Sequence, residues 1–258
     1  MNILVCIKAL PEPEHAIRTD TDVMDVRIDN DTDLRMSRFD EFAVEEAVLL
    51  KKSFPETIVD VITAGPENAQ KAIKRAMGMG ADSGIHILSD YATSCDASAV
   101  SEMIAGFAKE KSYDLVFCGI MSEDMMQFSV GPMIAQRLSI PWATSVVSAK
   151  TDPENCKIRV ERELEGGVRA IIEMPLPALL TIQSGINEPR YPSLSNLLRA
   201  NKSRIHEISA DDRPPATSLC RTIGYAYPEK KREGRILEGT AQEKAEGLLG
   251  ILREKSLI

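Results

Sequence analysis

Residues 58–66, IVDVITAGP, decide the fold. Five of the seven residues of the run Ile58 to Ala64 are apolar, which predicts a strand of a parallel sheet. Gly65-Pro66 closes the run and places a proline at the first position of a helix, where its missing N–H costs nothing. Apolar residues then recur at helical spacing at Ala69, Ala72, Ile73, Ala76 and Met77. The stretch therefore predicts a strand, a turn and a helix in succession.

The glycine-rich run GMGADSG, residues 78–84, superficially resembles a dinucleotide-binding fingerprint. That fingerprint follows a strand and opens a helix, whereas this run follows a helix and precedes the apolar strand Gly84 to Leu88. We therefore expect Gly78 and Gly80 to end the helix and lead into a turn.

The same alternation extends outward from this unit. Strands are predicted at residues 2–8 and 114–118, and a helix at about 38–52, where Ser37 and Asp40 resemble a capping box. A further helix carries Val100 to Phe107 and is capped near Ser94 or Asp96. Residues 14–35 read as a long loop with a short edge hairpin at Val26 to Asp29. The order β-α-β-α-β-α-β predicts a Rossmann-like α/β fold, a mostly parallel sheet with helices on both faces.

Beyond Pro141 the periodicity changes to two, as in antiparallel strands. Residues 145–150, 157–162 and 170–174 predict added strands, and Gly166-Gly167 suits the tight turn of a hairpin. Residues 178–182 predict another apolar strand. After Ile205 the regular alternation is lost, with a possible strand at 218–225 and a last helix at about 240–255. We expect a nucleotide-binding α/β domain at 1–186, a partner-recognition loop and short helix at 187–205, and a C-terminal extension at 206–258.

Composition restricts the classes of function. The 258 residues are 43% apolar and 27% charged, which is typical of a globular protein, and the net charge of -8 gives no basic footprint for nucleic acid. No apolar run is long enough to span a bilayer, and no leader is apparent before residue 2, so we expect a cytoplasmic protein. The five cysteines and three histidines are scattered, so neither a disulfide framework, a metal site nor a catalytic residue is predicted.

In a parallel sheet a ligand is expected beyond the carboxyl ends of the strands. The segments predicted to meet there are Cys6 to Leu10, Ser37 to Asp40, Ala64 to Glu67 and Gly119 to Gly131. The last follows a strand and precedes a helix face, so its amides suit a phosphate, although it has no Walker lysine. Glu123 and Asp124 in this segment are expected to cap the following helix or to lie in solvent.

Residues 187–205, NEPRYPSLSNLLRANKSRI, are unlike an ordinary core element. The two prolines favour an extended entry, and Ser193 is placed to cap a short helix with leucines at positions 194, 197 and 198. Two interpretations stay open. The helix either docks on its own domain or protrudes so that a leucine anchors a partner protein.

These motifs together resemble one family, the beta subunit of electron-transferring flavoprotein, also called the FixA family. The matching pieces are VRID (26–29), FAVEEA (42–47), AMGMGAD (76–82), VERE (160–163) followed by Gly166-Gly167, and NEPRYP (187–192) followed by Leu194 and Asn196. The likeness covers nearly the whole chain, and the NEPRYP motif is the most specific part.

The resemblance implies a heterodimer with an FAD-carrying alpha subunit on which the C-terminal extension packs. Such a dimer passes electrons between acyl-CoA dehydrogenase-type flavoproteins and an acceptor, and this chain would bind AMP or a second FAD. Leu194 matches the anchoring leucine, and Phe39 matches an aromatic residue that approaches the alpha-subunit flavin. The implied partner-binding residues are Leu194, Tyr191, Asn196, Leu197 and Arg199. The implied cofactor-binding residues are Cys6, Ser37, Arg38, Phe39, Asp40, Ala64, Gly119, Asp124, Met126, Gln127, Phe128, Ser129 and Val130.

The phosphate loop departs from the family pattern, Gly-x-Gln-Ala-Ile-Asp-x-Asp. Bulky residues stand at Met121, Met125, Met126 and Phe128. Four hypotheses therefore stay open: a carrier with AMP, an electron-bifurcating form that oxidises NADH at a second FAD, a structural subunit with a decayed nucleotide site, and an adenine-nucleotide-using hydrolase of related fold.

Overall fold

A computed structural model describes residues 1–12, 32–90, 96–209, 219–220, 234 and 236–258, together with the backbone of two short strands at 18–20 and 25–27. The chain divides into two compact units, residues 1–223 and residues 224–258. The predicted division at residues 186 and 205 stays a prediction.

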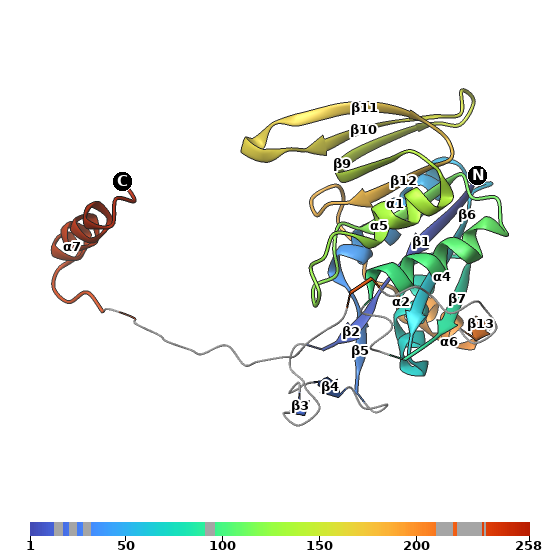
Figure 1. The fold of residues 1–258 in the computed structure, drawn as a ribbon, viewed down its shortest axis with the longest axis horizontal. Coiled ribbons are helices and arrows are strands. Elements are labelled where there is room, and N and C mark those ends of the chain that lie inside the picture. Colours follow the sequence, from blue (N-terminus) through green and yellow to red (C-terminus); the bar gives the residue numbers. More distant parts are fainter. Residues whose placement is uncertain are drawn as a thin grey trace. The chain divides into compact units, whose positions relative to one another are not determined.

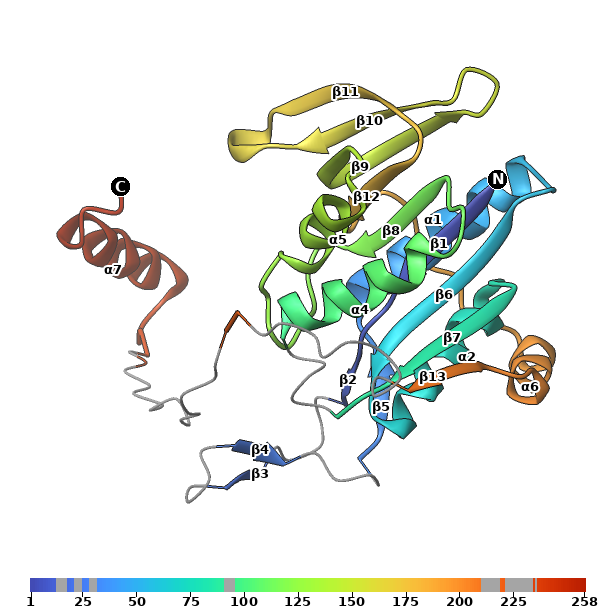
Figure 2. The same cartoon turned by 45° about the vertical axis from the view of Figure 1, so that its right-hand side comes forward.

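The first unit is built on a nine-stranded sheet with the order β11-β10-β9-β12-β8-β1-β6-β7-β13 (Figures 1 and 2). In this order every neighbouring pair from β9 to β13 at the far edge is parallel. The two pairs at the other edge, β9 with β10 and β10 with β11, are antiparallel. The predicted α/β class is therefore confirmed. The strands are β1 (Asn2–Cys6), β6 (Ile58–Gly65), β7 (Ser83–Leu88), β8 (Leu115–Gly119), β9 (Trp142–Asp152), β10 (Lys157–Glu163), β11 (Arg169–Pro175), β12 (Ala178–Ile182) and β13 (His206–Ser209).

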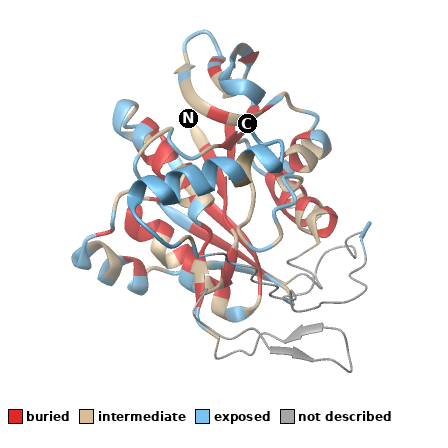
Figure 3. Ribbon diagram, turned by 90° about the vertical axis from the view of Figure 1, so that its left-hand side faces the viewer, coloured by how far each residue is buried: buried red, intermediate tan, exposed pale blue. Residues whose placement is uncertain are grey.

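Helices cover both faces of this sheet because the strands are apolar on both sides. On one face α1 (Arg38–Ser53) and α2 (Gln70–Met79) pack against side chains such as Val5 and Phe117. On the other, α4 (Ala97–Lys109) and α5 (Val130–Leu138) pack against Leu4 and Val116. The central strands are accordingly buried (Figure 3). The remaining helices are α6 (Leu194–Lys202), α7 (Ala241–Glu254) and the 3-10 turns η1 (Glu67–Ala69) and η2 (Glu165–Gly167).

Several turn predictions are confirmed at atomic detail. Gly166 and Gly167 have φ angles of 75° and 76° between β10 and β11. Asp96 caps α4 by accepting hydrogen bonds from two backbone amides. The short hairpin in the long loop is formed by β3 (Arg18–Asp20) and β4 (Asp25–Arg27), while residues 28 and 29 lie outside the described part of the chain.

Other predictions need correction. Ser37 stands at the N-cap of α1, but its side chain makes no capping hydrogen bond. Gly78 lies inside α2, where a Cβ would come within 2.9 Å of Leu197, and the turn is made by Gly80 with φ 133°. The strands β2 (Ala9–Pro11), β5 (Leu34–Met36) and β13 were not predicted, because three or four residues are too few to show a period.

The second unit contains α7, which begins after Thr240, close to the predicted start of the last helix. Thr240 and Glu243 form a capping box there. None of its residues is buried, and Leu248 and Leu249 are exposed. The possible strand at 218–225 lies largely outside the described residues. None of the helices described here is long and apolar enough to cross a membrane.

Candidate functional site

The candidate site lies where the direction of chain progression across the sheet reverses. From β1 the chain moves to β6 and β7 on one side and later returns to β8 on the other. In open α/β sheets ligands bind beyond the strand ends at such a switch point. A pocket of about 690 Å³, counting the open space at its mouth, lies there. Its lining is Cys6, Ile7, Lys8, Asp40, Ala64, Ala97, Val100, Ile104, Cys118, Gly119, Ile120, Met121, Ser122, Met125, Gln127, Phe128, Ser129, Val130 and Gly131.

The pocket brings together residues from all four predicted segments. Eight of the predicted cofactor residues line it: Cys6, Asp40, Ala64, Gly119, Gln127, Phe128, Ser129 and Val130. Five lie outside the lining, namely Ser37, Arg38, Phe39, Asp124 and Met126. Of the bulky loop residues, Met121, Met125 and Phe128 face the pocket, whereas Met126 does not line it and is 58% exposed. The first turns of α4, at Ala97 and Val100, complete the wall and were not predicted.

Asp40 joins three elements at the floor of the pocket. From the first turn of α1, its carboxylate accepts hydrogen bonds from the backbone N–H of Lys8, at 2.7 Å, and of Gly119, at 3.0 Å. A Cβ at position 119 would lie 2.8 Å from the Phe39 carbonyl carbon and 2.9 Å from the Asp40 backbone N atom, so this position requires glycine. Burial raises the pKa of Asp40 to about 7, against the opposing effects of the two amides and of the Lys8 charge.

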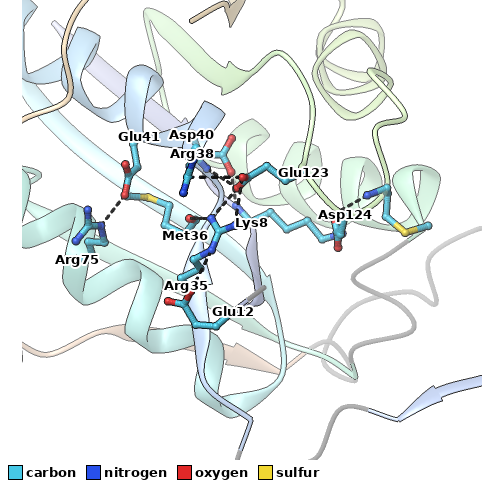
Figure 4. A network of polar contacts seen from close by, with 11 residues as sticks. Lys8, Glu12, Arg35, Met36, Arg38, Asp40, Glu41, Arg75, Glu123 and Asp124 are labelled. Carbon is cyan, nitrogen blue, oxygen red and sulfur yellow. Dashed lines mark hydrogen bonds and ion pairs between the residues drawn. The ribbon is translucent and has the colours of Figure 1, made fainter. Parts of the chain in front are cut away.

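A network of charges adjoins the pocket-lining residue Lys8 (Figure 4). Lys8 Nζ lies 2.7 Å from Asp124 Oδ2, and Arg35 Nη1 lies 2.7 Å from Glu123 Oε2. The backbone N–H of Arg38 also donates to Glu123, at 2.9 Å. Burial alone would raise the pKa of Asp124, but the Lys8 ammonium and hydrogen bonds from Ser122 and the Met125 amide together hold this pKa below its ordinary value. The expectation that Glu123 and Asp124 cap α5 or lie in solvent is therefore wrong, because both pair with groups on other elements.

Two cysteines lie side by side in the pocket wall. Cys6 and Cys118 are register partners on β1 and β8, and both are free thiols. A hydrogen bond with Cys6, together with burial, raises the pKa of Cys118 well above its ordinary value, so the thiol stays protonated at neutral pH. Within the described part of the chain, no cluster of three histidine, cysteine or acidic side chains is placed to hold a metal ion.

The segment at 187–205 is held by buried carboxylates of α1. Glu45 accepts three hydrogen bonds from Arg190, from the backbone N–H at 3.1 Å and from Nε and Nη2 at 2.7 and 2.6 Å. Asn187 Nδ2 donates to Glu46 at 3.0 Å and to the Phe42 carbonyl at 3.1 Å. These contacts join residues about 140 positions apart, so their pairing was not visible in the sequence.

The short helix α6 is docked on one side and exposed on the other. The Ser193 side chain caps it by accepting from Asn196 N, and Leu197 packs beside Gly78 of α2. Lys74 of α2 donates to the Ala200 carbonyl at the end of α6. By contrast Leu194 is 74% and Tyr191 82% exposed. Arg199, also exposed, donates to Asn196 Oδ1 at 3.3 Å. Docking of the helix on its own domain is therefore confirmed for one side. The other side carries the exposed Leu194, and its role in anchoring a partner stays a prediction.

Comparison with known proteins identifies the family of this chain. A model of the electron transfer flavoprotein domain matches residues 26–213. Electron transfer flavoprotein subunit beta of Methylophilus methylotrophus is 34% identical, with 98% of each chain covered. The Bacillus subtilis protein of the same name is 32% identical over 100% of both chains. The human one is 32% identical, over 93% of this chain and 94% of its own. The chain therefore belongs to the electron transfer flavoprotein beta subunit family.

Proposed function

We propose that this chain is the beta subunit of a heterodimeric electron carrier. In the proposed complex an alpha subunit holds the FAD that accepts and donates electrons, and this chain binds AMP. The complex passes electrons between acyl-CoA dehydrogenase-type flavoproteins and an acceptor. The relatives named above are beta subunits of electron transfer flavoproteins, which supports an alpha partner for this chain.

The observation that carries the nucleotide assignment is the pocket at the switch point between β1 and β8. Its apolar wall, including Ile104, Met121 and Val130, suits an adenine ring, since small-molecule sites combine apolar walls with a few polar groups. The N-terminus of α5 opens at Val130, beside the lining residues Ser129 and Gly131. Free amides and the helix dipole at such an end favour a phosphate. The residues present therefore fit an adenine nucleotide.

In this proposal the chain's own residues bind and position and do not react. The pocket holds the nucleotide, and the exposed side of α6 docks the redox partner. In the proposal Leu194 enters an apolar hollow of that partner. Its 74% exposure, and the contacts of Arg190 and Lys74 that hold the segment to the domain, support this role. An apolar anchor of this kind contributes roughly 2 kcal/mol or more when it is a hot spot.

The bound nucleotide is identified by purifying the alpha–beta complex, denaturing it and separating the released nucleotides by chromatography, with flavin counted by absorbance. We expect AMP and FAD in equal amounts. Twice as much FAD and no AMP would assign the pocket to a second flavin, as in the electron-bifurcating form. A complex that releases FAD but no second nucleotide would contradict the nucleotide assignment and favour a structural beta subunit.

A further inference from the structure

The charges around the pocket are balanced before any ligand arrives. Lys8 meets Asp124, and Arg35 meets Glu123, which also accepts the Arg38 amide. A nucleotide phosphate that enters this pocket therefore finds cations that already have carboxylate partners. Asp40 adds a further carboxylate in the lining itself, with the side chain 6% exposed.

Asp40 is placed at the switch point and not at its margin. The amides that bond to it belong to Lys8, just after β1, and to Gly119, the last residue of β8. These are the two adjacent strand ends between which the pocket opens. Amides that elsewhere in such sheets are available to a ligand's anion are here occupied by the protein's own carboxylate.

We propose that Asp40 takes up a proton when an anionic nucleotide binds, so that the affinity for the nucleotide falls as the pH rises above neutrality. The inference rests on the proposed function, because it takes the occupant of the pocket to be a nucleotide phosphate. Asp40 is then the residue that couples nucleotide binding to pH.

The groups that face Asp40 determine the direction of the effect. Lys8 faces Asp40 from the exit of β1, and Cys6 of β1 lines the same pocket. From β8 comes the Cys118 thiol, whose raised pKa keeps it protonated. The Asp124 carboxylate faces Asp40 from the loop after β8. On α1 itself Arg38 and Glu41 flank Asp40. The Arg38 amide bonds to Glu123 and the Glu41 carboxylate pairs with Arg75, both outside the pocket lining. A bound phosphate excludes water and adds negative charge, so both changes favour the neutral acid. Near neutral pH that proton is available, since the pKa of Asp40 is already about 7.

A competing arrangement is that Lys8 leaves Asp124 and turns to the phosphate. This would make binding depend on Lys8 and would involve no proton at Asp40. The two arrangements differ in their pH profile, which makes the inference testable.

The test uses the alpha–beta complex freed of nucleotide and measures AMP binding by isothermal titration calorimetry from about pH 6 to about pH 9. We expect the dissociation constant to be nearly constant below about pH 7 and to rise about tenfold per pH unit above it, because one proton is taken up. In Asp40→Asn this rise of the dissociation constant above about pH 7 is expected to disappear. The AMP phosphate itself titrates near pH 6. Its own effect on the dissociation constant therefore lies below the range above about pH 7, where Asp40 is read out. Adenosine, which has no phosphate, is the matched ligand and is expected to show a much smaller rise.

Proton uptake in the parent complex gives a second readout that needs no variant. Titrations at about pH 7.5 in two buffers of different ionisation enthalpy are expected to report uptake of up to one proton per AMP. Uptake of no proton, or the same pH profile in parent and Asp40→Asn, would overturn the inference and leave the nucleotide site standing. No binding of AMP or adenosine at any pH would instead overturn the proposed nucleotide site and this inference with it.

Discussion

Asp40 shows how far one residue's role depends on residues distant in the chain. Its spacing from Ser37 predicts a local capping box, yet its carboxylate bonds to amides 32 and 79 positions away. Because it is buried with amide donors and no bonded cation, its ionised form is less favoured in the folded chain than in water.

The pH dependence of stability follows from this environment. The pKa of Asp40 is about 7 in the folded chain against an ordinary value of 3.8, so the folded state binds the extra proton between these values. The stabilisation that protonated Asp40 gives the folded state is complete below pH 3.8 and is lost as the pH rises through about 7. Between about pH 4 and pH 7 the free energy of unfolding is therefore expected to fall as the pH rises, by on the order of 1 kcal/mol per pH unit.

Urea unfolding of parent and Asp40→Asn at several pH values checks this. The carboxamide loses one amide hydrogen bond at every pH, so a constant offset between the two proteins is expected. The slope with pH is the diagnostic quantity, and parallel slopes would show that Asp40 does not titrate in this range.

The Glu45–Arg190 pair is the second residue-scale feature that is open to a test. Glu45→Ala leaves the Arg190 guanidinium half-buried without its carboxylate, and we expect a loss of about 3 kcal/mol in the free energy of unfolding. This value is taken at the low end of the range because Arg190 is 28% exposed.

Chemical denaturation measures this loss, and the double variant Glu45→Ala/Arg190→Met serves as the control. Removing both charges is expected to recover part of the stability, since no unpaired ion remains. A single variant within about 0.5 kcal/mol of the parent would mean that the pair does not fasten the segment.

At the scale of elements, α6 has two sides with separate tasks. Leu197 packs on α2 beside Gly78, while Leu194 is exposed. We expect Leu194→Ala to leave flavin content and stability unchanged and to lower affinity for the acyl-CoA dehydrogenase-type partner by about 2 kcal/mol, roughly 30-fold.

Leu197→Ala is the matched control on the same helix. It is expected to destabilise the domain by about 1–2 kcal/mol, since a half-buried leucine costs less to truncate than a fully buried one. Electron-transfer rates at sub-saturating partner, with thermal unfolding in parallel, distinguish the two. Equal transfer rates in parent and Leu194→Ala would remove Leu194 from the docking surface.

The elements themselves were predictable where burial imposes a period. The strands at 58–65, 115–119 and 178–182 and the helices α1, α2 and α4 present apolar residues at the spacing that their faces require. The short strands β2, β5 and β13 were not, because pairing with a neighbour and not local pattern defines them.

At the scale of the whole molecule, the chain separates into a large unit and a small one, residues 1–223 and 224–258. The helix α7 of the small unit buries none of its own residues and exposes Leu248 and Leu249. We expect a chain that ends at Ile223 to keep the thermal unfolding temperature of the large unit and to assemble more weakly with the alpha subunit.

Co-purification and analytical ultracentrifugation with the alpha subunit measure that assembly. Leu248→Ala/Leu249→Ala in the full chain is the milder variant and is expected to weaken assembly in the same direction. Assembly of the shortened chain at full strength would exclude the C-terminal unit as a contact of the alpha subunit.

The sequence by itself determined the α/β class, the added antiparallel hairpin, the four segments at the strand ends and the family, because periodicity and short motifs are local properties. Only the tertiary structure decided which residues of those segments face the pocket, that Glu123 and Asp124 pair with Arg35 and Lys8, and that Asp40 bridges two strand ends. Arg35 and Glu123 are 88 residues apart. Contacts of that kind depend on how the packed sheet brings distant side chains together, and no local pattern records them.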